Sequence, residues 1–219
     1  MYDKLIRSKR RTLGLEITPS AEVILRVPES AKDSDIEKFL KRSACWIQRH
    51  KEKIARQIQE TPKRQYEEGE TFLYLGNTYE LRLAEKQKPK LLFKNMFFLS
   101  RRHEKEGKKI LIAWYKKEAK KVLHERVEIC ARLDNASYKK IRVTSARRRW
   151  GSCGNGALNF SWRLVMAPIE IIDYIVAHEV THLTHKNHKK RFRAKVKKLY
   201  PNYKSAEVWL KQNGHLLTI

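Results

Sequence analysis

A pair of histidines, His178 and His182, directly follows the longest apolar stretch of this 219-residue chain, residues 169–177, and narrows the folds open to it. A spacing of four residues puts both imidazoles on one face of a helix, one turn apart. Ile171, Tyr174 and Ile175 fall on the same stripe, so the histidines are expected to face the interior. Buried imidazoles need partners, because an unpaired buried polar group destabilises the fold. The pattern therefore predicts two ligands of one metal ion on one helix.

Glu179 completes the motif His-Glu-x-x-His over residues 178–182. It is rotated by about 100° from His178, so it can hydrogen-bond a metal-bound water without binding the metal itself. Such a carboxylate acts as a general base. We therefore expect Glu179 to be catalytic and the metal to be Zn²⁺. The alternative is two histidines that are satisfied within the core and bind no metal.

A third ligand is needed, and His185 and His188 compete for this role. On a straight helix His185 would lie a further turn along, away from a site centred between His178 and His182. His188 follows Asn187, a good N-cap residue, and it begins the inward-facing stripe of a further helix. We therefore expect His188 to complete the ligand set, with His185 next to the site or at a helix terminus.

Three other features near the motif are candidates for the site. The segment Trp150, Gly151 and Ser152 can present its backbone to an extended peptide by strand addition, although a tight turn packed on the core is as good an interpretation. Tyr203 is a candidate to stabilise an oxyanion, with simple packing as the alternative. Cys153 as a fourth zinc ligand would block hydrolysis, so we expect that position to stay open.

Several segments together resemble a known family of metallopeptidases. The resemblance is carried by RRWGSC, LNFSWRLVMAP, IDYIVAHEVTHLTHKNH, Phe192, Pro201-Asn202-Tyr203 and VWL, and in the amino-terminal half by SKRRTLGLEI. This combination is similar to the YgjP-like zinc metallopeptidases, minimal zincins that are related to the SprT and WLM groups. The resemblance implies a compact zincin core in which a twisted sheet lies over the active-site helix. It also implies His178, His182 and His188 as zinc ligands and Glu179 as the catalytic glutamate.

Patterning along the chain predicts a mixed α+β fold in two parts. Residues 1–105 are expected to form an amino-terminal region with a β-hairpin and a helix, and residues 106–219 the zincin-like metallopeptidase domain. Alternating apolar residues predict hairpins over 13–27 and 73–83 and two short strands within 91–98. Amphipathic periodicity predicts helices over 34–58 and about 110–133.

The last 80 residues are expected to hold the chemistry. Alternation predicts strands at 141–143 and 158–166, joined by a connection that contains Gly151, Gly154 and Gly156. Further helices are expected to start at Pro168, near Asn187 and around residue 206.

Composition limits the partners and the compartment. The balance of 49 basic and 24 acidic residues gives a net charge of +25, which favours polyanions, yet the basic residues are spread along the whole chain. The clusters 147–149 and 189–191 flank the candidate site, where an acidic substrate or one held on DNA would fit. No apolar stretch approaches the roughly 20 residues of a membrane span, and the start of the chain lacks an export signal. The three unpaired cysteines are typical of a reducing cytosol.

Taken together, the sequence predicts a cytoplasmic zinc metallopeptidase that cleaves peptide or protein substrates without a membrane partner. The alternative is a basic protein associated with nucleic acid, in which the zinc site is structural or vestigial.

Overall fold

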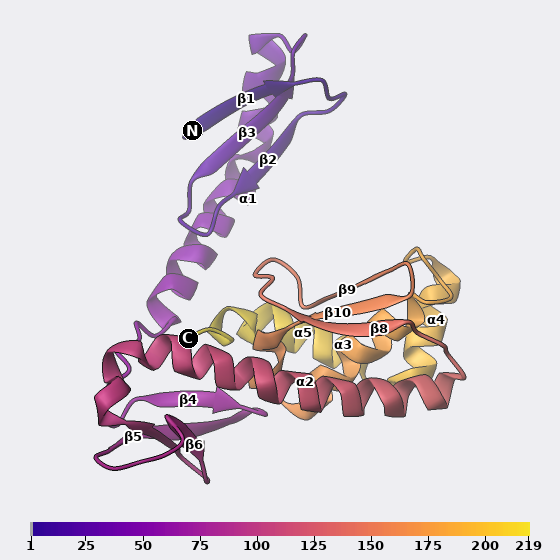
Figure 1. The fold of residues 1–219 in the computed structure, drawn as a ribbon. Helices are drawn as coiled ribbons and strands as arrows, with labels where there is room; N and C mark the ends of the chain where they lie inside the picture. The colour runs from indigo at the N-terminus through magenta and orange to yellow at the C-terminus, as the bar shows by residue number, and fades with distance from the viewer. Residues whose placement is uncertain (1) are drawn as a thin grey trace. The chain divides into compact units, whose positions relative to one another are not determined.

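The computed structural model describes residues 2–219 as a mixed α+β fold with three small sheets and five α-helices (Figure 1). The predicted α+β class is therefore confirmed. Contacts divide the chain into two compact units that meet between Pro62 and Lys63. The expected domain division after residue 105 stays a prediction. Strands within 71–100 share one hydrophobic core with the helices that follow them.

The first unit packs one sheet against one long helix. Its elements are β1 (Lys4–Ser8), β2 (Gly14–Ile17), β3 (Val23–Pro28) and α1 (Asp33–Glu60). The predicted hairpin and helix are confirmed, since β2 and β3 are antiparallel. Strand β1 was not predicted from the sequence; it pairs in parallel with β3. Val23, Leu25 and Val27 point from β3 to Ile36 and Leu40 of α1, so alternation on the strand meets helical spacing in one core.

The second unit begins with a sheet in the order β4-β5-β7-β6, followed by a long helix. The elements are β4 (Thr71–Tyr74), β5 (Asn77–Ala84), β6 (Leu91–Phe93), β7 (Phe97–Ser100), a short 3-10 helix (Arg101–Glu106) and α2 (Gly107–Asp134). The predicted hairpin, the two short strands and the long helix are confirmed. Phe72, Leu81 and Phe97 are fully buried, as are Leu111 and Leu123 of α2. This sheet and α2 therefore build one continuous core.

A third sheet lies next to the candidate site, in the order β8-β10-β9. Its strands are β8 (Lys140–Thr144), β9 (Gly151–Gly154) and β10 (Ala157–Ser161). One expectation was wrong here, and one strand was not predicted. The strand predicted over 158–166 ends at Ser161, and Trp162–Met166 form a 3-10 helix whose residues other than Arg163 are buried. The glycine-containing connection includes strand β9 itself, which pairs with β10 through a turn at Asn155 and Gly156.

Three helices complete the second unit: α3 (Ile169–Thr181), α4 (Lys190–Leu199) and α5 (Tyr203–Asn213). The start of α3 after Pro168 is as predicted. The helix expected near Asn187 begins at Lys190, because the backbone of Lys189 is extended and Lys189 takes the N-cap position. The Asn187 side chain still accepts a hydrogen bond from the Lys189 amide, as a capping side chain does. No helix within residues 2–219 is long and apolar enough to cross a membrane.

Helix α3 is held on several sides, which fixes the residues it carries. Ile172, Val176 and Val180 are fully buried in the main core. On another face, Arg126 of α2 forms a two-pronged ion pair with Asp173, in which the second guanidinium nitrogen donates to Oδ2 at 2.7 Å. This hydrogen bonding raises the pKa of Arg126 above its usual value.

We expect Arg126→Met to lower the free energy of unfolding by about 1–2 kcal/mol, because Asp173 is only 27% exposed and would lose its partner. Urea denaturation measures the change. The matched control is Arg132→Met on the same helix, whose ion pair with Glu128 is exposed, and its effect should stay within about 0.5 kcal/mol. Equal losses in both variants would show that the α2–α3 ion pair adds no stability.

Candidate metal centre

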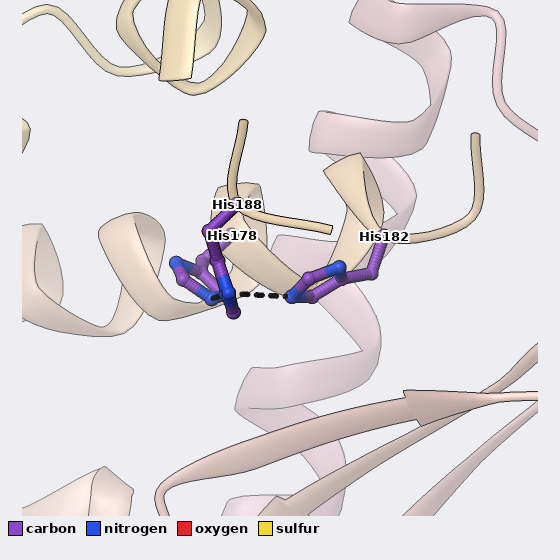
Figure 2. Close-up of side chains that lie close together, drawn as sticks. All are labelled: His178, His182 and His188. Carbon is purple, nitrogen blue, oxygen red and sulfur yellow. Dashed lines mark hydrogen bonds between the residues drawn. The ribbon is translucent and has the colours of Figure 1, made fainter. Parts of the chain in front are cut away.

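Three histidine rings converge at the end of α3 (Figure 2). His178 projects from the last turn of α3, His182 from its C-cap position and His188 from the loop before α4. The Nε2 atom of His188 lies 3.1 Å from Nε2 of His178 and 3.1 Å from Nε2 of His182. In residues 2–219, these are the side chains that form a cluster with metal-ligand geometry.

The spacing of the ring nitrogens fits a tetrahedral metal ion. Zinc binds imidazole nitrogen at about 2.0–2.1 Å, which places two ligand nitrogens of a tetrahedron about 3.3 Å apart. The two measured distances of 3.1 Å are close to that value. Three imidazoles are also a donor set that zinc prefers and that leaves a fourth position free.

Hydrogen bonding alone does not satisfy the three nitrogens. Nδ1 of His182 donates to the His185 carbonyl oxygen at 3.0 Å, which leaves Nε2 of neutral His182 as a lone pair. Nε2 of His188 carries at most one hydrogen, so that hydrogen serves only one of its two close contacts. In the neutral state one of the two close contacts therefore has either no hydrogen or two hydrogens between its nitrogens, and is not a hydrogen bond. A shared cation removes this conflict.

An apolar ring packs against all three imidazoles. The Phe192 ring is 3% exposed, and its centroid lies 4.9 Å from that of His178, 4.5 Å from His182 and 4.7 Å from His188. Burial lowers the pKa of His178 to about 4, and the neighbouring imidazoles act in the same direction. Burial also lowers the pKa of His182. Neutral imidazole is the form that binds a metal, so the surroundings favour the ligand state.

The carboxyl group of Glu179 is buried in the same place. The residue is 6% exposed, and its Oε2 atom has no hydrogen-bond partner among the described residues. Burial raises the pKa of Glu179 to about 7, opposed by the positive charge of Arg149. The backbone of β9 lies directly against this side chain. A Cβ atom added at Gly151 would come within 2.6 Å of Cγ and Oε1 of Glu179.

A cavity of about 700 Å³ opens in front of the histidines and Glu179. Its walls come from β9 and the following turn (residues 151–156), Arg149, α3 and the loop up to His188. A second cavity of about 520 Å³ shares His178 and His188 and continues between α3, α4 and α5. The histidines therefore lie where two cavities meet.

Comparison with known protein families matches residues 11–213 to the YgjP-like metallopeptidase domain. The chain belongs to the YgjP-like metallopeptidase family. The resemblance noted in the sequence is thus confirmed over nearly the full length. Searches of curated proteins and of solved structures gave no match. Membership of this family implies a metal ion, and the three converging histidines of this YgjP-like chain fit one.

The other candidate site residues of this YgjP-like chain line three different cavities. Gly151 and Ser152 line the cavity with the histidines, whereas Trp150 lines a neighbouring cavity of about 220 Å³. Tyr203 lines the second cavity, beside His178 and His188. Its role at an oxyanion, and the substrate contacts of the 150–152 segment, stay predictions.

His185 and Cys153 lie near the histidines without joining the cluster. Nδ1 of the His185 ring lies 2.9 Å from the Thr184 hydroxyl oxygen. The backbone carbonyl oxygen of His185 accepts the hydrogen bond from His182 Nδ1. Cys153 lines the cavity, and burial and the negative charge of Glu179 raise its thiol pKa. Sequence reasoning missed this carbonyl and the nearness of Arg149 to Glu179. Neither leaves a signal, since any residue has a carbonyl and Arg149 is one of many arginines.

We expect His188→Ala to weaken Zn²⁺ binding by at least about 100-fold, because it removes one of three ligands. Equilibrium competition with a chromogenic chelator measures the affinity. His185→Ala is the control, since its backbone carbonyl remains, and it should bind Zn²⁺ far more tightly than His188→Ala. The opposite order would assign the third ligand to His185.

Proposed function

We propose that this protein is a zinc-dependent metallopeptidase, with His178, His182 and His188 as ligands and Glu179 as general base. The observation that carries the proposal is the buried Oε2 atom of Glu179, which has no hydrogen-bond partner among residues 2–219, in a side chain that lines one cavity with the three converging imidazoles. A purely structural metal site has no use for such a carboxylate, whereas hydrolysis needs one. Membership of a metallopeptidase family supports the same choice.

The proposed arrangement is that of a zincin. Helix α3 carries the HExxH motif, and strand β9 runs past it at the edge of the β8-β10-β9 sheet. Bound zinc would supply Lewis acidity that polarises the carbonyl of the scissile bond. Glu179 takes a proton from the attacking water and passes it to the leaving amine. The close packing of Gly151 against Glu179 holds the carboxylate in one place.

The substrate is proposed to bind as an extended strand along β9. The sheet order leaves one edge of β9 without a neighbouring strand, and Gly151 and Ser152 line the cavity that holds the histidines. A peptide added at this edge would pass the metal and enter the cavity that contains Tyr203. Tyr203 would then be on hand to donate to the oxyanion.

We expect Glu179→Gln to retain zinc and to cut the hydrolysis rate by at least about 100-fold, the usual contribution of a positioned general base. Metal analysis and cleavage of an unfolded protein substrate by the zinc-loaded enzyme measure the two quantities. Glu170→Gln, an exposed carboxylate in the first turn of the same helix, is the matched control and should keep full activity. A fully active Glu179→Gln would assign the general base elsewhere.

We expect Gly151→Ala to lower activity by at least about 10-fold while zinc is retained, because the new methyl group would displace the Glu179 carboxylate. Gly154→Ala on the same strand is the matched control, since nothing lies within 4 Å of its added Cβ. Initial rates and zinc content of both variants test this. Equal rates for both would show that contact between β9 and Glu179 does not matter for catalysis.

A further inference from the structure

A chain of polar contacts connects the metal centre to a lysine outside it. Nζ of Lys195 on α4 donates to Oγ1 of Thr184 at 2.9 Å, and Thr184 Oγ1 lies 2.9 Å from Nδ1 of His185. The same ammonium group pairs with Oδ2 of Asp134, the last residue of α2, at 2.9 Å. One charged group therefore joins α2, α4 and the loop between α3 and α4.

This loop supplies much of the metal site and has little apolar packing of its own. Its residues 184 and 186–189 are exposed, and Leu183 is its apolar residue packed against the main core. Yet the loop carries His188, and its His185 carbonyl accepts the hydrogen bond from His182. Backbone hydrogen bonds from residues 183–185 to Val180 and Thr181 hold the start of the loop to α3, so polar side-chain contacts must tie the loop to α4 and α2.

The Lys195 side chain is less exposed to solvent than is usual for a lysine. The Lys195 side chain is 21% exposed and that of Asp134 only 9%, whereas Lys197 and Lys198 on the same helix are exposed. Partly buried charges are kept when they are paired and hydrogen-bonded, and Lys195 has both kinds of partner. An ammonium has three hydrogens, so it can hold Asp134 and Thr184 at the same time.

We infer that Lys195 is a positioning residue for the metal centre, which acts through Thr184 to hold the loop that presents the His185 carbonyl and His188. With Lys195 bonded to one lone pair of the Thr184 hydroxyl, the hydroxyl hydrogen has two acceptors in reach, His185 Nδ1 at 2.9 Å and the Thr181 carbonyl oxygen at 3.3 Å, of which His185 Nδ1 is the closer. The ring and the carbonyl of residue 185 are then both fixed, and the His182 ring keeps Nε2 as its ligand atom. The inference rests on the metal site of the proposed function and not on peptidase activity.

The test measures Zn²⁺ affinity of the full chain by competition with a chromogenic chelator, with the melting temperature of the metal-free protein as the measure of folding. Lys195→Met keeps the apolar stem and removes the ammonium, and Thr184→Val removes the hydroxyl at an exposed position. Each should weaken Zn²⁺ binding by about 10- to 100-fold. Because both substitutions act through one contact, the double variant should lose no more Zn²⁺ affinity than the single variant that binds Zn²⁺ less tightly.

Two substitutions serve as controls. Lys198→Met removes an exposed lysine from the same helix, and Thr184→Ser keeps the hydroxyl, so both should bind Zn²⁺ within about twofold of the unmodified chain. The inference is overturned if Lys195→Met or Thr184→Val binds equally tightly, or if their losses add in the double variant. Failure of the unmodified chain to bind Zn²⁺ at all would instead overturn the proposed function.

Discussion

The whole site depends on three ring nitrogens that are held closer together than their own hydrogens can satisfy. Two lone pairs, or two N–H groups, that face each other at about 3 Å repel. The fold accepts this strain because α3 is fixed in the core and Phe192 packs against every ring. A divalent cation converts the repulsion into three bonds. The three imidazoles could therefore hold one metal ion, and burial favours the neutral form of His178 and His182.

The residues that could bind the metal differ from the residue proposed to act as general base. The three histidines converge at the end of α3, whereas the Glu179 side chain is buried against β9, and its Oε2 atom has no hydrogen-bond partner among residues 2–219. A strand edge and two cavities meet at this point, so an extended chain has room to pass. The arrangement suits hydrolysis of a peptide better than storage of an ion. The nucleic-acid partner and the cytoplasmic location stay predictions from composition.

Much of the fold and of the candidate site could be predicted from the sequence, because the spacing of neighbouring residues determines these features. His178 and His182 are one turn apart in any helix, and alternation located both predicted hairpins. Prediction failed where tertiary contacts decide. Residues 162–166 alternate like a strand, but burial of nearly every one of them suits a 3-10 turn equally well. Strand β1 pairs in parallel with a strand that is distant in sequence, which leaves no turn signal. The helix expected from about Asn187 begins at Lys190, because the Lys189 backbone is extended although the Asn187 side chain makes a cap-like hydrogen bond to its amide.

X-ray absorption spectroscopy of the zinc-loaded protein reports the atoms around the metal, and so shows whether three histidines hold it. We expect three imidazole nitrogens at about 2.0–2.1 Å and one further light atom from solvent, with no sulfur. A sulfur shell at about 2.3 Å would place Cys153 on the metal and close the position that hydrolysis needs. A spectrum with fewer than three imidazoles would contradict the convergence of His178, His182 and His188 on one ion.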